Sequence, residues 1–467
     1  MSVTPTSANG SWLDEAKATL RLGWPLVLTQ IAFTLLTAVN VVLAGQLGRI
    51  ELATVSLAVT LYFTVFMFCL GVATAVAPMV AQAVGHKAKM LRDVRRTVRQ
   101  GYWVMAAIGV PGMVILANAE PILREFGQAP LLAHKAEAYL RISALGFLPA
   151  LWSVVTRNFL TALSRPRVVL TAAIVGVLYN AGAGWLLSHG RFGLPDLGVN
   201  GIATASASAG AMMFLVMLAY SYADRQLRRF HILGRFWHSD WPRFREVIRL
   251  GVPIGATLVL EVGMFSAAAL MMGILGSDEL AAHQIALQCA STAFMVPLGL
   301  SQATSVRVGI FAGARYAEGV RRAGWTGIAV GTAFVVMTGL LFWFAPRPLI
   351  GLFVDLDDKA NVNVVVFASN YLAVAGLFQV VDALQVLGAG ALRGLRDTRL
   401  PLLFAAFGYW AVGFPIAGLL AFKTPLGGVG VWIGLAVALS AVAVLMVARF
   451  ALRSRYHIGP RLAAAYR

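Results

Sequence analysis

One stretch of the sequence occurs twice and decides the fold. Residues 45–53 read GQLGRIELA and residues 273–281 read GILGSDELA, so six of the nine residues recur after 228 positions. The same shift, without a gap, places LGWP at 22–25 on LGVP at 250–253. Matches of Leu, Gly and Ala are common in apolar sequence, but an ungapped register across two apolar runs and their connection is not. The chain is therefore predicted to consist of two homologous halves.

The composition is that of a membrane protein. The 467 residues are 59% hydrophobic and only 12% charged, with a mean hydropathy of +0.76. A soluble protein of this length would need far more charge to cover its surface. A spanning helix needs roughly 20 mostly apolar residues. The runs that qualify are 22–44, 52–78, 99–118, 138–161, 168–188, 198–221, 248–275, 282–305, 324–345, 362–390, 400–421 and 429–450. We predict an all-α polytopic membrane protein with twelve transmembrane helices.

The repeat divides these helices into two pseudo-symmetric six-helix bundles. Near the end of each half, LGVNG at 197–201 is answered by LGGVG at 426–430. Six helices per half make the repeat parallel, with a symmetry axis along the membrane normal. The predicted organisation is an N-terminal lobe at 1–221, a cytoplasmic linker at 222–247 and a C-terminal lobe at 248–467. Two such bundles are typical of an alternating-access carrier.

The net charge of +18 would suggest nucleic-acid binding in a soluble protein. The basic residues, however, concentrate in two connections, one after the second apolar run and one between the halves. These are Lys87, Lys89, Arg92, Arg95, Arg96 and Arg99 in the first, and Arg225, Arg228, Arg229, Arg235, Arg243, Arg245 and Arg249 in the second. Lys and Arg accumulate in loops that stay in the cytoplasm. We therefore predict cytoplasmic termini and no nucleic-acid partner.

Two carboxylates lie within apolar runs of the second half. Glu261 is near the middle of the run 248–275, and Asp382 is in the run 362–390. A charged side chain at the centre of a spanning helix costs about 2.5–3.5 kcal/mol on insertion scales, so it indicates function. No basic residue is expected at a similar depth in this half. The alternative is that both acids only form hydrogen bonds between helices.

Helical spacing predicts which side chains accompany these acids. They are Gln379 and Gln385 beside Asp382, Gln284 and Gln288 on the neighbouring helix, and Phe265 and Met272 beside Glu261. Together they predict oxygen ligands next to soft apolar surface. Hard cations such as Na⁺ take carboxylate and amide oxygens, and a buried acid can bind a proton instead. Glu261 and Asp382 are therefore candidate cation ligands, with Na⁺ as the candidate metal ion.

Other chemistry finds little support in the sequence. It contains no phosphate-binding loop, no Gly-x-Ser-x-Gly elbow and no His/Cys spacing for a metal. We therefore predict no enzyme activity, no catalytic residue and no cofactor, and we expect an ion gradient to supply the energy. Arg393, Arg396 and Arg399 are interpreted as anchors at an inner helix end.

At the residues around the two acids, the chain resembles a known family. LEV at 260–262, FQVVDALQV at 378–386 and ALRGLRDTR at 391–399 are similar to the NorM-like branch of the multidrug and toxic compound extrusion (MATE) family. So are GQLG at 45–48 and PMVAQAVG at 78–85. The resemblance covers about residues 15–455. Each motif alone is weak, and the ordered set is specific.

The resemblance implies a V-shaped two-lobe fold in a bacterial inner membrane. It also implies an antiporter that exports cationic and amphipathic drugs in exchange for Na⁺ or H⁺. A glutamate in the seventh helix and an aspartate in the tenth serve cation coupling in that family, and they correspond to Glu261 and Asp382. Membrane lipids surround the chain, which we expect to be a monomer.

This sequence departs from the family pattern at two positions. Many relatives carry an aspartate in the first helix, where this chain has Asn40, and Asn180 resembles the amide partner of that N-lobe site. Asn40 cannot take up a proton, so cation coupling is expected to rest on the C-terminal lobe. Some sodium-coupled relatives have a tyrosine one turn before the tenth-helix aspartate, where this chain has Phe378.

The main alternative is a lipid or polysaccharide flippase of the same superfamily. Anionic headgroups would require basic side chains in the cavity, and only Arg141 and Arg157 are candidates within apolar runs. A passive channel is a further alternative, although it explains the paired acids less well.

Overall fold

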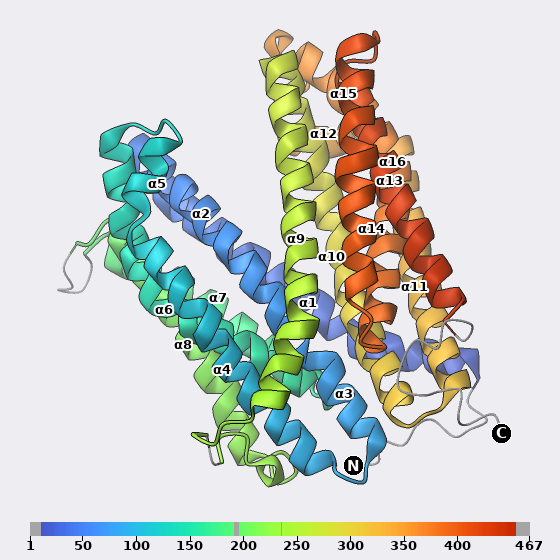
Figure 1. Ribbon diagram of the computed structural model, residues 1–467. Coiled ribbons are helices and arrows are strands. Elements are labelled where there is room, and N and C mark those ends of the chain that lie inside the picture. Colours follow the sequence, from blue (N-terminus) through green and yellow to red (C-terminus); the bar gives the residue numbers. More distant parts are fainter. Residues whose placement is uncertain (1–10, 191–195, 235, 454–467) are drawn as a thin grey trace. The chain divides into compact units, whose positions relative to one another are not determined.

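The computed structural model describes residues 11–190, 196–234 and 236–453. These residues form helices and connections without a strand, which confirms the all-α prediction (Figure 1). Their contacts divide the chain into two compact units. We call Leu28–Gly255 the N-terminal unit. The C-terminal unit comprises the residues up to Val27 together with those from Ala256 onward.

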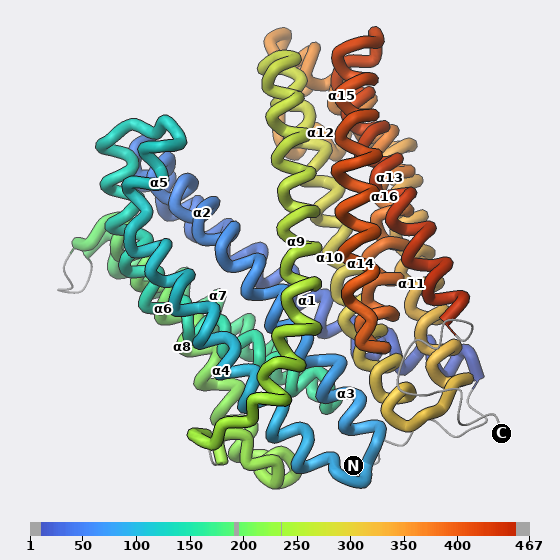
Figure 2. Tube along the Cα trace, viewed as in Figure 1, coloured from blue at the N-terminus to red at the C-terminus, as the bar shows by residue number. Residues whose placement is uncertain are grey.

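The borders of both units fall inside helices. α1 (Trp12–Leu47) gives its first part to the C-terminal unit, and α9 (Trp241–Leu275) gives its first part to the N-terminal unit. Figure 2 follows both helices as continuous tubes. The predicted lobes 1–221 and 248–467 with the linker 222–247 divide the chain by its repeat, and they stay a prediction. The predicted cytoplasmic termini include residues 1–10 and 454–467, which lie outside the described residues.

Between α1 and α9, the N-terminal unit contains both long and short helices. They are α2 (Arg49–Thr74), α3 (Val76–His86), α4 (Met90–Ala117), α5 (Ala119–Glu125), α6 (Pro130–Ala162), α7 (Pro166–Ser188), α8 (Val199–Ala223) and the 3-10 helix η2 (Arg228–Phe230). α6 packs against α2, α4 and α8, and α7 packs along α8 (Figure 1). At the α6–α8 contact, a Cβ on Gly146 would lie 2.5 Å from the Ala207 Cα, so the close approach requires glycine.

After α9, the remaining helices of the chain belong to the C-terminal unit. Its helices are α10 (Ser277–Gly313), α11 (Ala317–Phe344), α12 (Pro346–Ile350), the 3-10 helix η3 (Lys359–Asn361), α13 (Val362–Gly394), α14 (Arg399–Ala406), the π-helix η4 (Phe407–Gly413), α15 (Phe414–Lys423) and α16 (Gly428–Ala451). α13 is central and packs against α10, α11 and α16. α14, η4 and α15 form one continuous helical rod with a widened middle turn, at the predicted run 400–421.

Eleven helices of the described chain are long and apolar enough to cross a membrane. Eleven of the predicted runs lie within these spans to within one residue, and of these the run 52–78 lies in the span Arg49–His86, which continues through α2 and α3. The run 282–305 lies in α10, which has 37 residues. α10 is more polar than the others, because His283, Gln284 and Gln288 interrupt its apolar sequence. The short helices α5 and α12 were not predicted.

The repeated sequence motif has a local structural cause. Gly48 and Gly276 directly precede α2 and α10, and each is followed three residues later by a glutamate. A Cβ on Gly48 would lie 2.7 Å from a Glu51 carboxylate oxygen, and a Cβ on Gly276 would meet Glu279 in the same way. The glutamate carboxylate therefore lies close to the start of its helix. Gly48 has a φ of +143°, which residues other than glycine rarely adopt.

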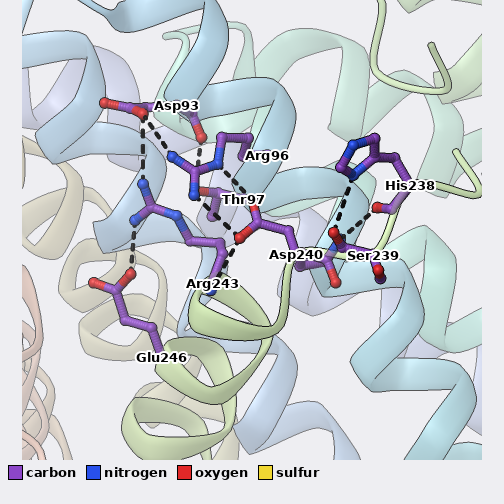
Figure 3. Close-up of polar contacts among 9 residues, drawn as sticks. Asp93, Arg96, Thr97, His238, Ser239, Asp240, Arg243 and Glu246 are labelled. Carbon is purple, nitrogen blue, oxygen red and sulfur yellow. Dashed lines mark hydrogen bonds and ion pairs between the residues drawn. The ribbon is translucent and has the colours of Figure 1, made fainter. Parts of the chain in front are cut away.

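A network of ion pairs fastens the start of α9 within the N-terminal unit (Figure 3). Asp240 accepts hydrogen bonds from Arg96 of α4, with Oδ1 3.0 Å from the Arg96 Nη2. Arg243 pairs with Asp93 of α4 at 3.5 Å and with Glu246 at 2.7 Å. Because Arg96 also contacts Asp93, the charges of the two segments alternate across the contact. Two of the arginines counted as topological therefore also fix the entry into α9.

Candidate cation and substrate site

The two predicted acids line one cavity of about 340 Å³ in the C-terminal unit. Glu261 comes from α9, Asp382 from α13 and Gln284 from α10, so three helices build the site. The complete lining is Glu261, Val262, Phe265, Ser266, Ala269, Gln284, Leu287, Ala290, Ser291, Phe294, Phe378 and Asp382. Neither acid is sealed inside helix packing, since both border open volume.

Asp382 is the more deeply placed acid, with 5% of its surface exposed. Its Oδ1 is buried and has no hydrogen-bond partner among the described residues. Burying a carboxylate without a partner is costly, because the lost hydration is not replaced. The Glu261 and Asp382 carboxyls are also near enough to repel each other when both are charged. The pair is therefore stabilised by any cation or proton that enters the cavity.

Gln385 lies behind the two acids on α13. It interacts with the Glu261 carboxyl, yet its own Oε1 is buried without a hydrogen-bond donor in the described part of the chain. The site thus holds two unsatisfied acceptor oxygens, Asp382 Oδ1 and Gln385 Oε1. Carboxylate and amide oxygens are ligands that Na⁺ accepts. Where the chain is described, no cluster of three His, Cys, Asp or Glu side chains is present, so any Na⁺ site must use amide and hydroxyl oxygens as well.

Two functional candidates were missed by the sequence analysis. Arg393, interpreted as an anchor, lies at the end of α13 and interacts electrostatically with Glu261. Tyr409 interacts electrostatically with both acids, and its buried hydroxyl points toward Gln385 without completing a hydrogen bond among the described residues. Tyr409 lies in the π-helix η4, and such bulges are frequent at functional sites.

Four of the predicted neighbours do not line the cavity, namely Gln385, described above, and Gln288, Gln379 and Met272. Gln379 accepts a hydrogen bond at 3.0 Å from Thr338 of α11, and Met272 is fully buried in the core. Gln288 is exposed, and it is absent from the cavity lining although Gln284 belongs to it. Helical spacing predicted their faces correctly but could not predict which neighbouring helix covers each face.

The walls of the cavity are aromatic and aliphatic. Phe265 and Phe378 meet edge to face with ring centroids 6.1 Å apart, and Phe378 packs in turn on Trp432 at 5.4 Å. Ser266 and Ser291 add hydroxyl groups that the sequence analysis did not select. Such a site can bind an apolar body through its rings and a positive charge through its acids.

The predicted N-lobe site has a different character. Asn180 of α7 donates a hydrogen bond at 2.8 Å to Asn40 Oδ1 of α1. The Ser206 hydroxyl of α8 lies 3.1 Å from Asn40 Oδ1 and 3.0 Å from Asn180 Oδ1. Asn40 is 5% exposed and Asn180 is fully buried. The predicted pair is therefore brought together, in a closed network of neutral groups.

Comparison with known proteins identifies the family. A family model described as MatE matches residues 25–186 and 253–419, once in each half. The chain is also 45% identical to a "Probable multidrug resistance protein NorM" of Mesorhizobium japonicum, over 97% of this chain and 96% of the relative. The chain belongs to the MatE family. This MatE protein is also 43% identical to a NorM of the same description from Brucella suis biovar 1, over 94% of this chain and 93% of that one.

Solved structures confirm the fold of this MatE protein. The crystal structure of the eukaryotic MATE transporter AtDTX14 matches it with a TM-score of 0.83, over 96% of this chain and 99% of that one. The sequence identity is 22%, so this likeness speaks for the fold alone. The resemblance inferred from the motifs around Glu261 and Asp382 is thereby confirmed, and the chain is a multi-pass membrane transporter of this family.

Proposed function

We propose that this MatE protein is a secondary antiporter that exports cationic and amphipathic small molecules in exchange for Na⁺ or H⁺. The observation that carries the proposal is the cavity of the C-terminal unit, in which two acids, Glu261 and Asp382, face apolar walls. The relatives named multidrug resistance proteins support the substrate class. The aromatic rings suit the apolar body of such a substrate, and the acids suit its charge.

The charges of the site suggest a stoichiometry. With Glu261 and Asp382 ionised and Arg393 protonated, the cluster carries one net negative charge. One monovalent ion or one singly charged substrate neutralises it, and the two ligands then compete for the same acids. For exchange, each ligand must bind the inward- and outward-open states with different affinity. We therefore expect one Na⁺ or H⁺ per substrate cation.

A lipid or polysaccharide flippase fits the cavity less well. Anionic headgroups need basic side chains at the binding surface. The residues that line the 340 Å³ cavity include two acids and no Lys or Arg. The Arg141 side chain is engaged elsewhere, in an ion pair with Glu137 at 2.5 Å.

The membrane placement follows from the basic connections. Residues 87–99 and 225–249 lie on the cytoplasmic side, which puts both termini in the cytoplasm of a bacterial inner membrane. In this arrangement the substrate enters from the cytoplasm or the inner leaflet, and the coupling ion arrives from outside. The transporter works as a monomer surrounded by lipid.

Exchange in proteoliposomes tests the proposal directly. The purified full chain is reconstituted, and efflux of a fluorescent organic cation is followed under an imposed Na⁺ gradient and, separately, under an imposed proton gradient. We expect one of the two gradients to drive export. Glu261→Gln and Asp382→Asn should lower the gradient-driven rate at least about ten-fold, within the range of a typical coupling free energy.

The matched control is Glu318→Gln, which removes an exposed acid of the same unit that pairs with Arg321 at 2.8 Å. Its rate should equal that of the unmodified chain. Full export by both cavity variants at normal reconstitution would show that the acids do not couple the ion. Export that ignores both gradients would show that the protein is not an antiporter of this kind.

A further inference from the structure

A second cavity lies in the N-terminal unit around an arginine. Its lining is Phe33, Ser153, Val154, Arg157, Val169, Ala172, Ala173, Met213 and Met217. It leaves about 10 Å³ for the centre of a water-sized sphere. That is roughly the space that one buried water or one ion of similar size occupies. Arg157, on α6, is the charged member of this lining.

Arg157 is buried, and one of its donors, Nε, lacks a hydrogen-bond partner among the described residues. The residue is 7% exposed. Its contact in the cavity is the ring of Phe33, whose centroid lies 5.2 Å from the guanidinium carbon. The Ser153 hydroxyl donates its proton at 2.7 Å to the Ala150 carbonyl on its own helix, and its oxygen is a neutral acceptor that does not balance the charge of the guanidinium. No acid lines the cavity.

Arg141 lies earlier in the same helix, and its guanidinium has the partners that Arg157 Nε lacks. Its guanidinium pairs with Glu137 at 2.5 Å and donates to the Ala117 carbonyl at 3.1 Å, and most of its side chain is exposed. Both arginines belong to α6. Of these two arginines, Arg157 is the buried one, and it is Arg157 that lacks a carboxylate partner in the described chain.

Burying a guanidinium without an acidic partner destabilises the folded state. Arginine stays protonated in proteins and carries five N–H donors. A cation–π contact offsets only part of the cost of burying a charge without a partner. Apart from the Ser153 hydroxyl, the cavity wall provides methyl, methylene, aromatic and thioether groups, which are poor acceptors of a hydrogen bond and carry no negative charge. A negatively charged group from outside the chain would complete the site.

We propose that the Arg157 cavity binds a small monovalent anion of the size of chloride. The size follows from the room for one water-sized sphere. The anion should carry a single charge, because a phosphate needs many hydrogen-bond donors and the cavity offers one guanidinium. Phe33 lies over the cation and closes the apolar side. This anion site in the N-terminal unit is separate from the acidic cavity of the C-terminal unit and does not depend on its function.

Thermal unfolding of the purified full chain tests the site. The midpoint is measured in sodium chloride and in sodium gluconate at equal Na⁺ concentration and ionic strength, because gluconate is too large for the cavity. A ligand that binds only the folded state stabilises it in proportion to ln(1 + [L]/Kd). We expect a midpoint about 2–4 °C higher in chloride, and a similar rise when bromide replaces chloride.

Three variants locate the effect. Arg157→Met, which keeps a long unbranched side chain but removes the charge, should unfold at the same midpoint in both salts. Arg157→Lys retains a charge and should keep a smaller chloride effect, which also covers the case in which Arg157→Met does not fold. Arg225→Met removes an exposed arginine and should behave as the unmodified chain.

Equal midpoints of the unmodified chain in chloride and gluconate would overturn the proposal. The same holds for a chloride effect that persists in Arg157→Met, since the ion would then bind elsewhere. If an anionic phospholipid occupies the cavity instead, chloride will not shift the midpoint, and native mass spectrometry will detect lipid on the unmodified chain but not on Arg157→Met.

Discussion

The two units place polar clusters in related helices, and the clusters differ in whether their hydrogen bonds are complete. In the N-terminal unit, the Asn40 and Asn180 oxygens both have partners, within 3.1 Å. In the C-terminal unit, Asp382 Oδ1 and Gln385 Oε1 have none among the described residues. A neutral, satisfied network stabilises helix packing by itself. An acidic, unsatisfied one is stabilised by a ligand, which supports the proposal that the C-terminal unit exchanges ions while the N-terminal cluster is structural.

Replacing the Asp382 carboxylate by a neutral amide, as in the N-terminal cluster, should have the largest effect on export. Asp382→Asn removes the charge that repels Glu261 and supplies an amide donor for Gln385 Oε1. We expect gradient-driven export to fall at least about ten-fold, while the thermal midpoint rises, because a strained ligand site is relaxed. Export and unfolding are measured on the same preparation. A variant that exports normally, or one that loses export only because it unfolds, would break the comparison.

The converse change is expected to destabilise the N-terminal unit. Asn40→Asp places a carboxylate into a buried network that has two hydrogen-bond donors and no countercharge. We expect a loss of about 1–3 kcal/mol in the free energy of unfolding and no gain in ion-driven export. Denaturant unfolding in detergent measures the first and proteoliposome efflux the second. Asn40→Asp that creates proton coupling in an Asp382→Asn background would show that the two clusters are interchangeable.

Two tyrosines sharpen the comparison further. The Tyr409 hydroxyl in the C-terminal unit lacks a partner in the described chain, whereas the Tyr102 hydroxyl in the N-terminal unit lies 2.8 Å from the Thr156 hydroxyl. If the Tyr409 hydroxyl is kept for the coupling ion, Tyr409→Phe should lower export about three- to ten-fold without loss of stability. Tyr102→Phe should cost about 1 kcal/mol of stability and leave export unchanged. Equal behaviour of the two variants in both assays would contradict the assignment.

The sequence predicted the fold well because its signals are physical requirements of a bilayer. Long apolar runs, an ungapped repeat and rare buried acids are visible without coordinates, and they gave the helices, the halves, and Glu261 with Asp382. Helical spacing failed for Gln288, Gln379 and Met272, because it identifies a face but not the helix that covers it. Arg393 was taken for an anchor, since a long side chain can reach far from its own helical level. Tyr409 was missed because the π-helix shifts the faces of the rod in a way that a 3.6-residue period does not contain.

The ion-pair network at the start of α9 should give the smallest effect, because its charges are satisfied and partly exposed. The Arg96 guanidinium, through its hydrogen bonds, lowers the pKa of Asp240, and the Arg243 backbone N–H contributes in the same direction. A folded-state pKa below the unfolded value stabilises the chain at pH values above the unfolded one, which is about 3.9. This stabilisation is then lost as the pH falls through the lowered folded-state pKa.

Asp240→Asn should therefore lower the free energy of unfolding by about 1 kcal/mol at pH 7, and the difference from the unmodified chain should shrink as the pH falls below about 4. Unfolding midpoints across a pH series measure this difference. Glu318→Gln is the control, since that exposed pair should contribute almost nothing at any pH. A difference that is constant from pH 7 to pH 3 would mean that Asp240 acts through packing. In that case the ion pairs between α4 and the start of α9 would not be what holds this segment in the N-terminal unit.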